Sequence, residues 1–159
     1  MQIRIIAAGK LRERHFREGV AEYVKRLGPY TRIEVMEVAD EAIPQNASVA
    51  QASAARKKEG ARMLEKIGKR DYVVALAVGG RRFSSEAFAD FLDARMQNGD
   101  VIVTFVIGGS TGLSTELMAR ANISLSFSEM TFPHQLMRVI LTEQIYRAFK
   151  IIHHEPYHK

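Results

Sequence analysis

The stretch Val101-Ile-Val-Thr-Phe-Val-Ile107, followed by Gly108-Gly-Ser-Thr-Gly112, decides the fold. An unbroken apolar run of this length predicts a strand that is covered on both faces, as in a parallel sheet. A second run of the same kind spans Tyr72 to Val78. The glycines after the first run permit positive φ and a close approach of ligand to backbone amides at the carboxyl end of a central strand. A tight structural turn explains the same glycines equally well.

Hydrophobic spacing on both sides of these runs alternates between the strand and the helix period. The further strands expected are Ile3 to Ala8, Ile33 to Val38 and Ile123 to Phe127, and the helices expected are Phe16 to Leu27, about 52–67, Ser84 to Met96, a short one from Thr115, and a long one from Pro133 or His134 to Ile152. The polar stretch Gln45 to Ala54 is expected to be a mobile loop. This alternation predicts an α/β fold with a mostly parallel sheet sandwiched by helices, as a single domain over residues 1–159.

The composition excludes several classes of protein. The chain has 159 residues, 47% of them hydrophobic, and no cysteine. Disulfide scaffolds, thiolate zinc sites and cysteine nucleophiles are therefore excluded. Neither apolar run approaches the ~20 residues of a membrane helix, and the first residues lack the order of a signal peptide. We expect a cytoplasmic protein that makes no membrane contact.

Positive charge is concentrated in the N-terminal half. Residues 1–70 hold 15 basic and 9 acidic side chains, whereas residues 71–159 hold 8 and 9. The dense stretches Lys10 to Arg17 and Arg56-Lys-Lys58 are able to neutralise the phosphates of a nucleic acid. Solvated faces of ordinary helices account for the same charges.

Two more loops would join the glycine loop at one edge of a parallel sheet. They are Gly79-Gly-Arg-Arg82 and the segment from Phe127 to Phe132, and three loops at one edge predict a pocket. The spacing of Gly108, Gly109 and Gly112 matches neither the dinucleotide-binding fingerprint nor a Walker P-loop. Four of the five histidines lie in the last 26 residues without a metal-ligand spacing, so no metal site is expected.

The last helix and the C-terminal tail each leave two alternatives open. The apolar positions of the last helix cover an arc too wide for contact with a sheet alone, so either a second subunit covers it or the helix lies deep within its own domain. The tail His153 to Lys159 is either disordered or an aromatic platform whose imidazoles stack on and hydrogen-bond a base.

Several motifs together resemble one known family. Gly108-Gly-Ser-Thr-Gly-Leu-Ser114, Thr131-Phe-Pro-His134, the helix segment Arg138 to Arg147 and His154-Glu-Pro-Tyr-His158 are similar to the small SPOUT-class ribosomal RNA methyltransferases called RlmH. The resemblance covers essentially the whole chain and includes Gly80-Arg-Arg-Phe-Ser-Ser-Glu86.

The resemblance implies a homodimer whose C-terminal part forms a trefoil knot, although knots are nearly absent from folds in general. It implies that S-adenosylmethionine sits in the knot and that its methyl group goes to N3 of a pseudouridine in large-subunit (23S) ribosomal RNA on the assembled ribosome. The cofactor contacts implied are Leu76, Gly108, Phe127, Ser128, Glu129, Met130, Thr131 and Phe132.

Two positions depart from the family's pattern. Ser110-Thr111 stands where the family often has Pro followed by a variable residue, and Ala77-Val78 stands where an acidic residue is common. The first departure loosens the loop without removing amide donors. The second leaves no acidic role at that place.

The resemblance also suggests catalytic roles. We hypothesise that His134, or Tyr157 and His158 from the partner's tail, orients or deprotonates the pseudouridine, and that Arg138 or Arg147 steadies phosphate or developing charge. A nonenzymatic ribosome- or RNA-binding dimer of the same fold is the alternative. A flavodoxin-like protein with a phosphate-bearing ligand at Gly108–Gly112 is a third.

Overall fold

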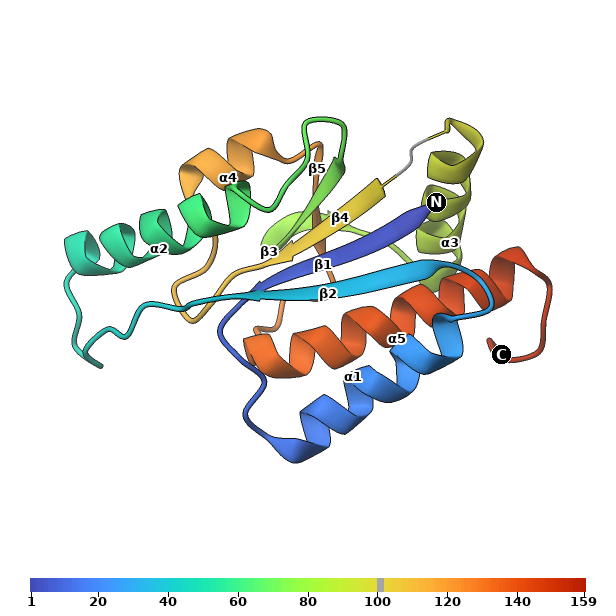
Figure 1. Cartoon of the computed structure of the whole chain (residues 1–159), viewed down its shortest axis with the longest axis horizontal. Coiled ribbons are helices and arrows are strands. Elements are labelled where there is room, and N and C mark those ends of the chain that lie inside the picture. Colours follow the sequence, from blue (N-terminus) through green and yellow to red (C-terminus); the bar gives the residue numbers. More distant parts are fainter. Residues whose placement is uncertain (100–101) are drawn as a thin grey trace.

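A computed structural model describes residues 1–99 and 102–159 and shows a parallel sheet between two layers of helices (Figure 1). The elements in chain order are β1 (Gln2–Ala8), α1 (Arg14–Leu27), β2 (Arg32–Val38), α2 (Val49–Leu64), β3 (Tyr72–Arg82), α3 (Ser85–Gln97), β4 (Ile102–Ile107), α4 (Thr115–Arg120), β5 (Ile123–Ser126) and α5 (His134–Ile152). The predicted α/β architecture is confirmed. Val101, the expected start of β4, lies outside the described residues.

The strand order is β2-β1-β4-β3-β5, and every pairing within it is parallel. The central strand β4 is therefore the apolar run that ends at Ile107, just before the glycine loop. Its side chains alternate between two cores, because Phe105 and Ile107 belong to one cluster of buried residues and Val106 to the other. An unbroken apolar run is what a strand covered on both faces requires.

The two faces carry different helices. In Figure 1, α2 and α4 cover one face, and α1, α3 and α5 cover the other. Met63 of α2 and Leu117 of α4 pack in the smaller core. Leu141 and Phe149 of α5 are completely or almost completely buried in the larger one. In the part of the chain that the structure describes, no helix is long and apolar enough to cross a membrane.

Helix α2 begins earlier than the sequence analysis expected. The Ser48 hydroxyl accepts a hydrogen bond from the backbone N–H of Gln51 (3.1 Å), and the Gln51 side chain accepts one from the Ser48 N–H (2.8 Å). This capping box satisfies donors at the first turn of the helix. Residues 49–54, expected in a mobile loop, are therefore helical, and the helix ends at Leu64 rather than at residue 67.

Strand β3 meets β5 in two separate places. Leu125 of β5 pairs with Leu76 and again with Arg81, with a shift of register between the two pairings. A Cβ atom on Gly80 would lie 2.7 Å from the carbonyl carbons of both Ser124 and Leu125. Only glycine allows the chain to pass the β5 backbone this closely.

The last helix is covered by its own chain. Helix α5 packs between α1 and α3 as well as against the sheet, and its apolar positions are buried or partly buried. Of the two alternatives, burial within its own domain therefore accounts for much of the apolar arc, while several of its positions stay partly exposed.

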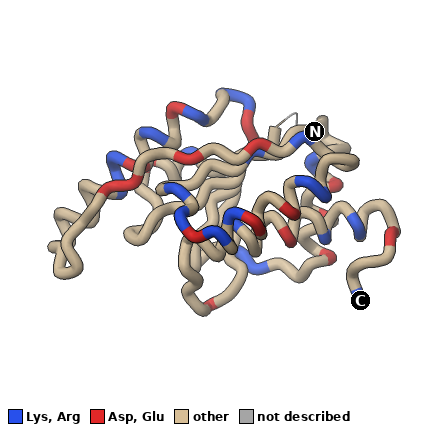
Figure 2. Tube along the Cα trace, turned by 60° about the horizontal axis from the view of Figure 1, so that its bottom comes forward, with Lys and Arg blue, Asp and Glu red and all other residues tan. Residues whose placement is uncertain are grey.

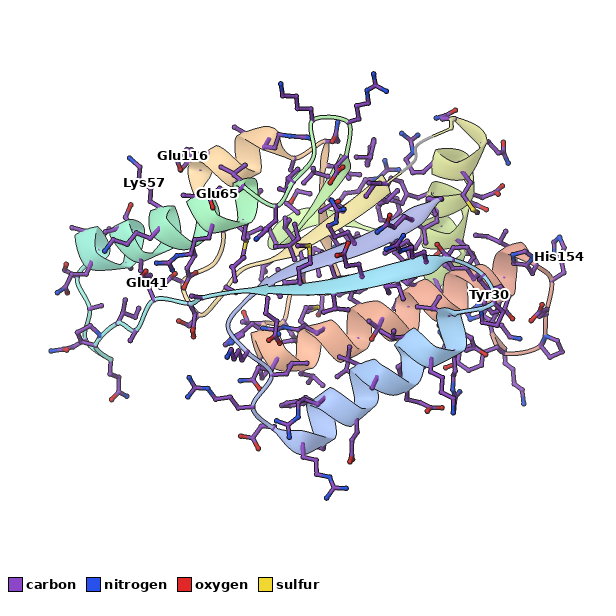
Figure 3. All side chains as sticks on the ribbon, in the orientation of Figure 1. Tyr30, Glu41, Lys57, Glu65, Glu116 and His154 are labelled. Atoms are coloured by element: carbon purple, nitrogen blue, oxygen red, sulfur yellow. The ribbon has the colours of Figure 1, made fainter. Side chains whose placement is uncertain are left out.

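The C-terminal tail folds back onto this helix rather than being disordered. The Tyr157 hydroxyl donates to Glu143 (3.0 Å), and Nε2 of His158 lies 2.7 Å from a carboxylate oxygen of Glu86. On the other side, Lys150 and the Tyr30 hydroxyl both bind Glu155 (Tyr30 is labelled in Figure 3). These contacts order the tail against α3, α5 and the turn after α1.

Candidate active site

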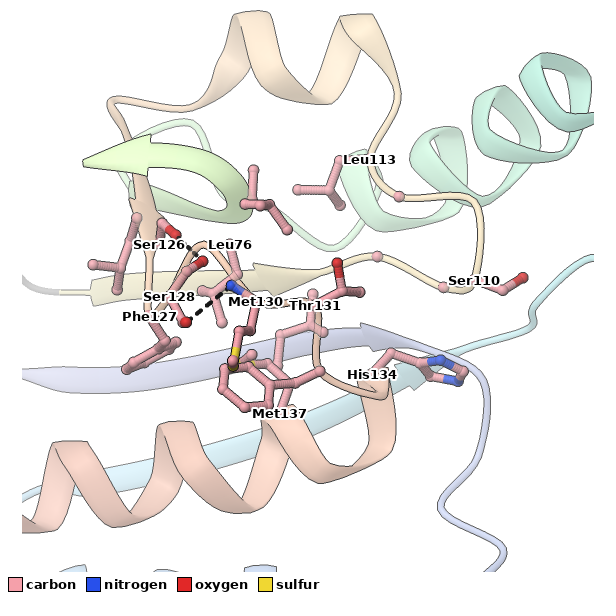
Figure 4. A pocket seen from close by; sticks show the side chains of 18 residues that line it. Leu76, Ser110, Leu113, Ser126, Phe127, Ser128, Met130, Thr131, His134 and Met137 are labelled. Carbon is pink, nitrogen blue, oxygen red and sulfur yellow. Dashed lines mark hydrogen bonds between the residues drawn. The ribbon is translucent and has the colours of Figure 1, made fainter. Parts of the chain in front are cut away.

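A cavity of about 270 Å³ opens at the carboxyl edge of the sheet (Figure 4). Its walls come from the ends of β3, β4 and β5 and from the start of α5, in agreement with a pocket formed by several loops at one edge. The lining residues are Leu76, Ala77, Val78, Ile107, Gly108, Gly109, Ser110, Gly112, Leu113, Leu125, Ser126, Phe127, Ser128, Met130, Thr131, Phe132, His134 and Met137. The Gly79–Arg82 segment was expected to line the pocket but does not, because Arg81 and Arg82 pair with β5. The residues just before it, up to Val78, line the cavity instead.

The glycine loop after β4 forms one wall of the cavity. The N–H of Gly112 donates to the carbonyl of Gly109 (3.1 Å), and Gly112 has φ +84°. A Cβ on Gly108 would lie 2.6 Å from the carbonyl group of Gly112. Two of the three glycines are therefore required by the turn itself, by positive φ at one and by close packing at the other. The turn places backbone amides and carbonyls, rather than side chains, at the wall.

The loop after β5 forms the opposite wall. The Ser126 hydroxyl donates to the Ser128 carbonyl (2.9 Å), and the Ser128 hydroxyl accepts from the N–H of Met130 (3.0 Å), as the dashed lines in Figure 4 show. Of the eight residues expected to contact the cofactor, seven line the cavity. Glu129 is the exception, because its exposed carboxylate pairs with Arg82 (3.1 Å).

His134 is the catalytic candidate that the structure brings to the cavity. It is the first residue of α5, and its half-buried imidazole stands at the cavity rim (Figure 4). Burial lowers the pKa of His134, and the charge of Arg138 lowers it further, while Asp40 opposes both. The neutral imidazole, the form that can accept a proton, is therefore favoured near neutral pH.

Arg138 lies one helical turn further on and is completely buried. Its guanidinium donates to Glu37 (2.9 Å) and to the carbonyls of Ala8 (2.8 Å) and Gly9 (2.6 Å). These bonds fasten α5 to the ends of β1 and β2. The structure thus places both terminal nitrogens in contacts within the chain, not in the lining of the cavity.

Tyr157 and His158 are not among the residues that line the cavity of their own chain. Tyr157 bonds Glu143, which lies nine residues, or roughly 13.5 Å, along α5 from His134, and His158 lies against Glu86 of α3. The guanidinium of Arg147 stacks on the Tyr157 ring at 4.8 Å and lies 3.2 Å from Nδ1 of His158. Within one chain, therefore, His134 lines the cavity and the two tail residues do not.

Several lining residues were missed by sequence reasoning. Leu113, Leu125 and Met137 face the cavity but read as ordinary core positions. The helical period offered a signal for one of them, since Met137 stands three positions after His134 on the same face of α5. Among residues 1–99 and 102–159, no group of three or more histidine and acidic side chains is arranged to hold a metal ion.

The cavity and fold can now be compared with known proteins. Residues 1–158 match the family described as predicted SPOUT methyltransferase. The chain is 55% identical to ribosomal RNA large subunit methyltransferase H of Carboxydothermus hydrogenoformans and 54% identical to that of Bacillus cytotoxicus, in both cases over the full length of both chains.

Solved structures share the fold at low sequence identity. A probable methylase family protein from Haemophilus influenzae gives a TM-score of 0.59 at 13% identity, covering 99% of this chain and 70% of its own. A probable methyltransferase from Bordetella pertussis gives 0.58 at 15% identity, covering 93% of this chain and 96% of its own. The chain thus belongs to the SPOUT methyltransferase family, among relatives that carry the name ribosomal RNA large subunit methyltransferase H.

Proposed function

We propose that the protein is an S-adenosylmethionine-dependent methyltransferase that modifies N3 of a pseudouridine in 23S ribosomal RNA on the assembled ribosome. The observation that carries the proposal is the cavity, which is formed by the loops that the family resemblance assigned to the cofactor. Full-length relatives named for methylation of large-subunit ribosomal RNA support the substrate class.

The residues around the cavity fit this cofactor. Leu76, Leu125 and Phe127 offer apolar surface for a purine, and the Gly108 turn offers backbone polar groups where a side chain would not fit. When bound, the sulfonium supplies an already activated methyl group, so no metal or cysteine is needed. The residues of the chain have to align the nucleophile and receive its proton.

His134 is placed for the proton transfer. Because its pKa is lowered, its neutral ring accepts the N3 proton of the pseudouridine as N3 takes the methyl group. Arg138 acts indirectly, since it holds the first turns of α5 against the ends of β1 and β2.

A homodimer would supply the remaining candidates. Val78 and Met130, at the cavity rim, expose 54% and 75% of their surface. A second subunit over the rim would cover these apolar side chains and bring its Tyr157 and His158 within reach. The exposed apolar side chains at the cavity mouth thus support the dimer.

A trefoil knot is part of the proposal as well. Its support is the double pairing of β5, which meets Leu76 and Arg81 of the same strand, and the close crossing at Gly80. Exposed basic residues after β1, including Lys10, Arg12 and Arg14, stand at the same sheet edge as the cavity and suit RNA phosphates.

Labelled methyl transfer to ribosomes that lack the modification tests the function, with the modified nucleotide mapped afterwards and free 23S RNA as the comparison substrate. We expect one labelled pseudouridine and transfer to ribosomes only. Ribosome binding without transfer would favour the nonenzymatic dimer. Calorimetry in which a flavin binds and S-adenosylmethionine does not would favour the flavodoxin-like alternative.

A further inference from the structure

The outer side of the glycine loop rests on helix α2. Arg56 donates from Nη1 to the carbonyl of Thr111 (3.2 Å). One turn further along α2, the carboxylate of Glu59 lies 3.1 to 3.2 Å from the place that a Cβ on Gly109 would occupy. The next residue, Gly60, is so close to Ser114 that a Cβ there would lie 2.1 Å from the serine hydroxyl. Three residues of α2 thus contact the segment between Gly109 and Ser114, the N-cap of α4.

Glu59 is unusual among these contacts because it is only 4% exposed. One carboxylate oxygen accepts from the N–H of Glu41 (2.9 Å), and the other has no hydrogen-bond partner among the residues described. Burying a carboxylate with one unpaired oxygen costs free energy. Here it fills the space behind Gly109, where the loop has no side chain of its own.

The other face of α2 is different in character. Lys57 and Lys58 are exposed. Lys57 lies 4.0 Å from Glu116 of α4, away from the cavity, and Figure 3 labels Lys57 and Glu116. The three consecutive basic residues of this helix are therefore not equivalent. Arg56 binds the Thr111 carbonyl of the glycine loop, whereas its two neighbours are exposed.

We propose that α2 positions the cofactor loop, with Arg56 holding the Thr111 carbonyl and Glu59 supporting Gly109 from behind. The inference rests on the proposed binding of S-adenosylmethionine in the cavity. Arg56 is a positioning residue, because it acts on the cofactor only through the loop. The three basic residues, grouped from the sequence as able to neutralise phosphates, are accordingly divided: Arg56 binds the glycine loop, and Lys57 and Lys58 remain exposed.

Calorimetry with S-adenosylmethionine tests the inference on the Arg56→Gln variant. A hydrogen bond from a charged donor is lost, so we expect the Kd to rise about tenfold. Arg56→Lys keeps the charge and one donor and should recover part of the affinity. Arg62→Gln is the matched control, because Arg62 on the same helix donates to the Ala39 carbonyl (2.8 Å) and pairs with Glu41 instead of the loop. Its Kd should stay within about twofold of wild type.

Two further measurements separate positioning from a loss of stability. In steady-state assays, Arg56→Gln should raise KM for S-adenosylmethionine and leave KM for ribosomes unchanged. In the free protein, hydrogen exchange of amides 109–113 should become faster in Arg56→Gln and not in Arg62→Gln.

The outcomes separate this inference from the function on which it rests. Wild-type affinity and wild-type loop exchange in a folded Arg56→Gln protein would overturn the positioning role. Equal losses in Arg56→Gln and Arg62→Gln would also overturn it, as a general effect on α2. A wild-type protein that does not bind S-adenosylmethionine would overturn the proposed function, and hydrogen exchange alone would then decide whether Arg56 holds the loop.

Discussion

Glu59 links the stability of the protein to pH. Burial raises the pKa of this carboxyl, and the nearby Asp40 and Glu41 raise it further, against a smaller opposing effect of the Glu41 N–H and Arg62. A raised folded-state pKa means that the folded protein favours the protonated form, so stability is lost as pH rises through that pKa. Glu59→Gln removes the ionisation and keeps the acceptor for Glu41.

We therefore expect Glu59→Gln to be more stable than wild type at pH 8, with the difference shrinking as the pH falls to 5. Urea unfolding at both pH values measures it. A difference that is constant with pH would contradict ionisation of Glu59 as its cause. Glu65→Gln, an exposed change at the end of the same helix, is the control (Glu65 is labelled in Figure 3).

His134 gives a second pH prediction, this time for activity. Its pKa is lowered, chiefly by burial, so the ring stays neutral to a lower pH than an exposed imidazole. If it accepts the proton, the pKa that governs the acid limb of the pH–rate profile should lie below about 6.5, the ordinary histidine value. His134→Ala should lower kcat by about 10²-fold or more and remove that limb. A limb that persists in His134→Ala would assign it to another group.

Arg138 allows a prediction of stability. Replacing it with Met removes the cation that pairs with Glu37 and the donor to two strand-end carbonyls. Breaking a buried pair costs about 3–5 kcal/mol, and the cost is toward the lower end here because Glu37 is 33% exposed and keeps the Leu11 N–H as a donor. Arg14→Met breaks an exposed pair with Glu18 and should cost less than about 1 kcal/mol. Urea unfolding compares the two variants, and equal losses would show that the Arg138 contacts contribute little.

At the scale of elements, the close crossing of β3 and β5 can be tested on two neighbouring glycines. A Cβ at Gly80 would lie 2.7 Å from β5 backbone atoms, whereas a Cβ at Gly79 meets nothing within 4 Å. Gly80→Ala should therefore cost at least about 1–3 kcal/mol in the free energy of unfolding, because the backbone has to move. Gly79→Ala should change it by less than about 0.5 kcal/mol. Equal effects in thermal or urea unfolding would contradict the crossing.

These elements also mark how far the sequence is informative. The limits of α5 were predicted to within a residue, because Pro133 and a long apolar period are local signals. The predicted start of α2 is three residues late, because the small residues after Ser48 lack an apolar period and only the capping box of Ser48 and Gln51 marks the first turn. The double pairing of Leu125 joins residues that are far apart in the chain, and no local pattern encodes it.

The same distinction holds at the site. The glycine loop and the loop from Phe127 to Phe132 were expected at one edge because parallel strands align their carboxyl ends. Arg56 and Glu59 were not expected there, since their contact with the loop depends on how α2 packs across the sheet face. The sequence alone does not distinguish Arg56 from Lys57 and Lys58, because their different surroundings depend on how α2 packs in the fold.

At the scale of the whole molecule, charge is interspersed. Figure 2 shows acidic positions between the basic ones along α1, and the pairs Arg14–Glu18 and Arg26–Glu22 partly neutralise its excess. The positive balance of the N-terminal half thus does not form a uniform basic helix. The basic residues before Arg14 follow β1 directly and lie at the functional edge of the sheet.

The separation of His134 from the tail yields a prediction about the dimer. Deleting residues 153–159, or changing His134→Ala, should each lower methyl transfer by about 10²-fold or more. A mixed dimer of the two variants keeps one complete site if the tail acts on the partner, so an equimolar, exchanged mixture should recover about a quarter of the sites. Methyl transfer by the mixture measures this. No recovery, with subunit exchange shown by mass spectrometry, would contradict action across the dimer, and full activity of the deletion variant would exclude the tail altogether.

The central position of β4 has a consequence for how the protein is made. Strands β1 and β2 emerge first, and β3 follows, but nothing in the sheet joins β1 to β3 until β4 is inserted between them. A nascent chain that ends before residue 102 therefore leaves unpaired the backbone N–H and C=O groups on the two strand edges, one of β1 and one of β3, that later face β4. Once β4 has left the ribosome both edges close, and the same strand then delivers the glycine turn to the finished sheet.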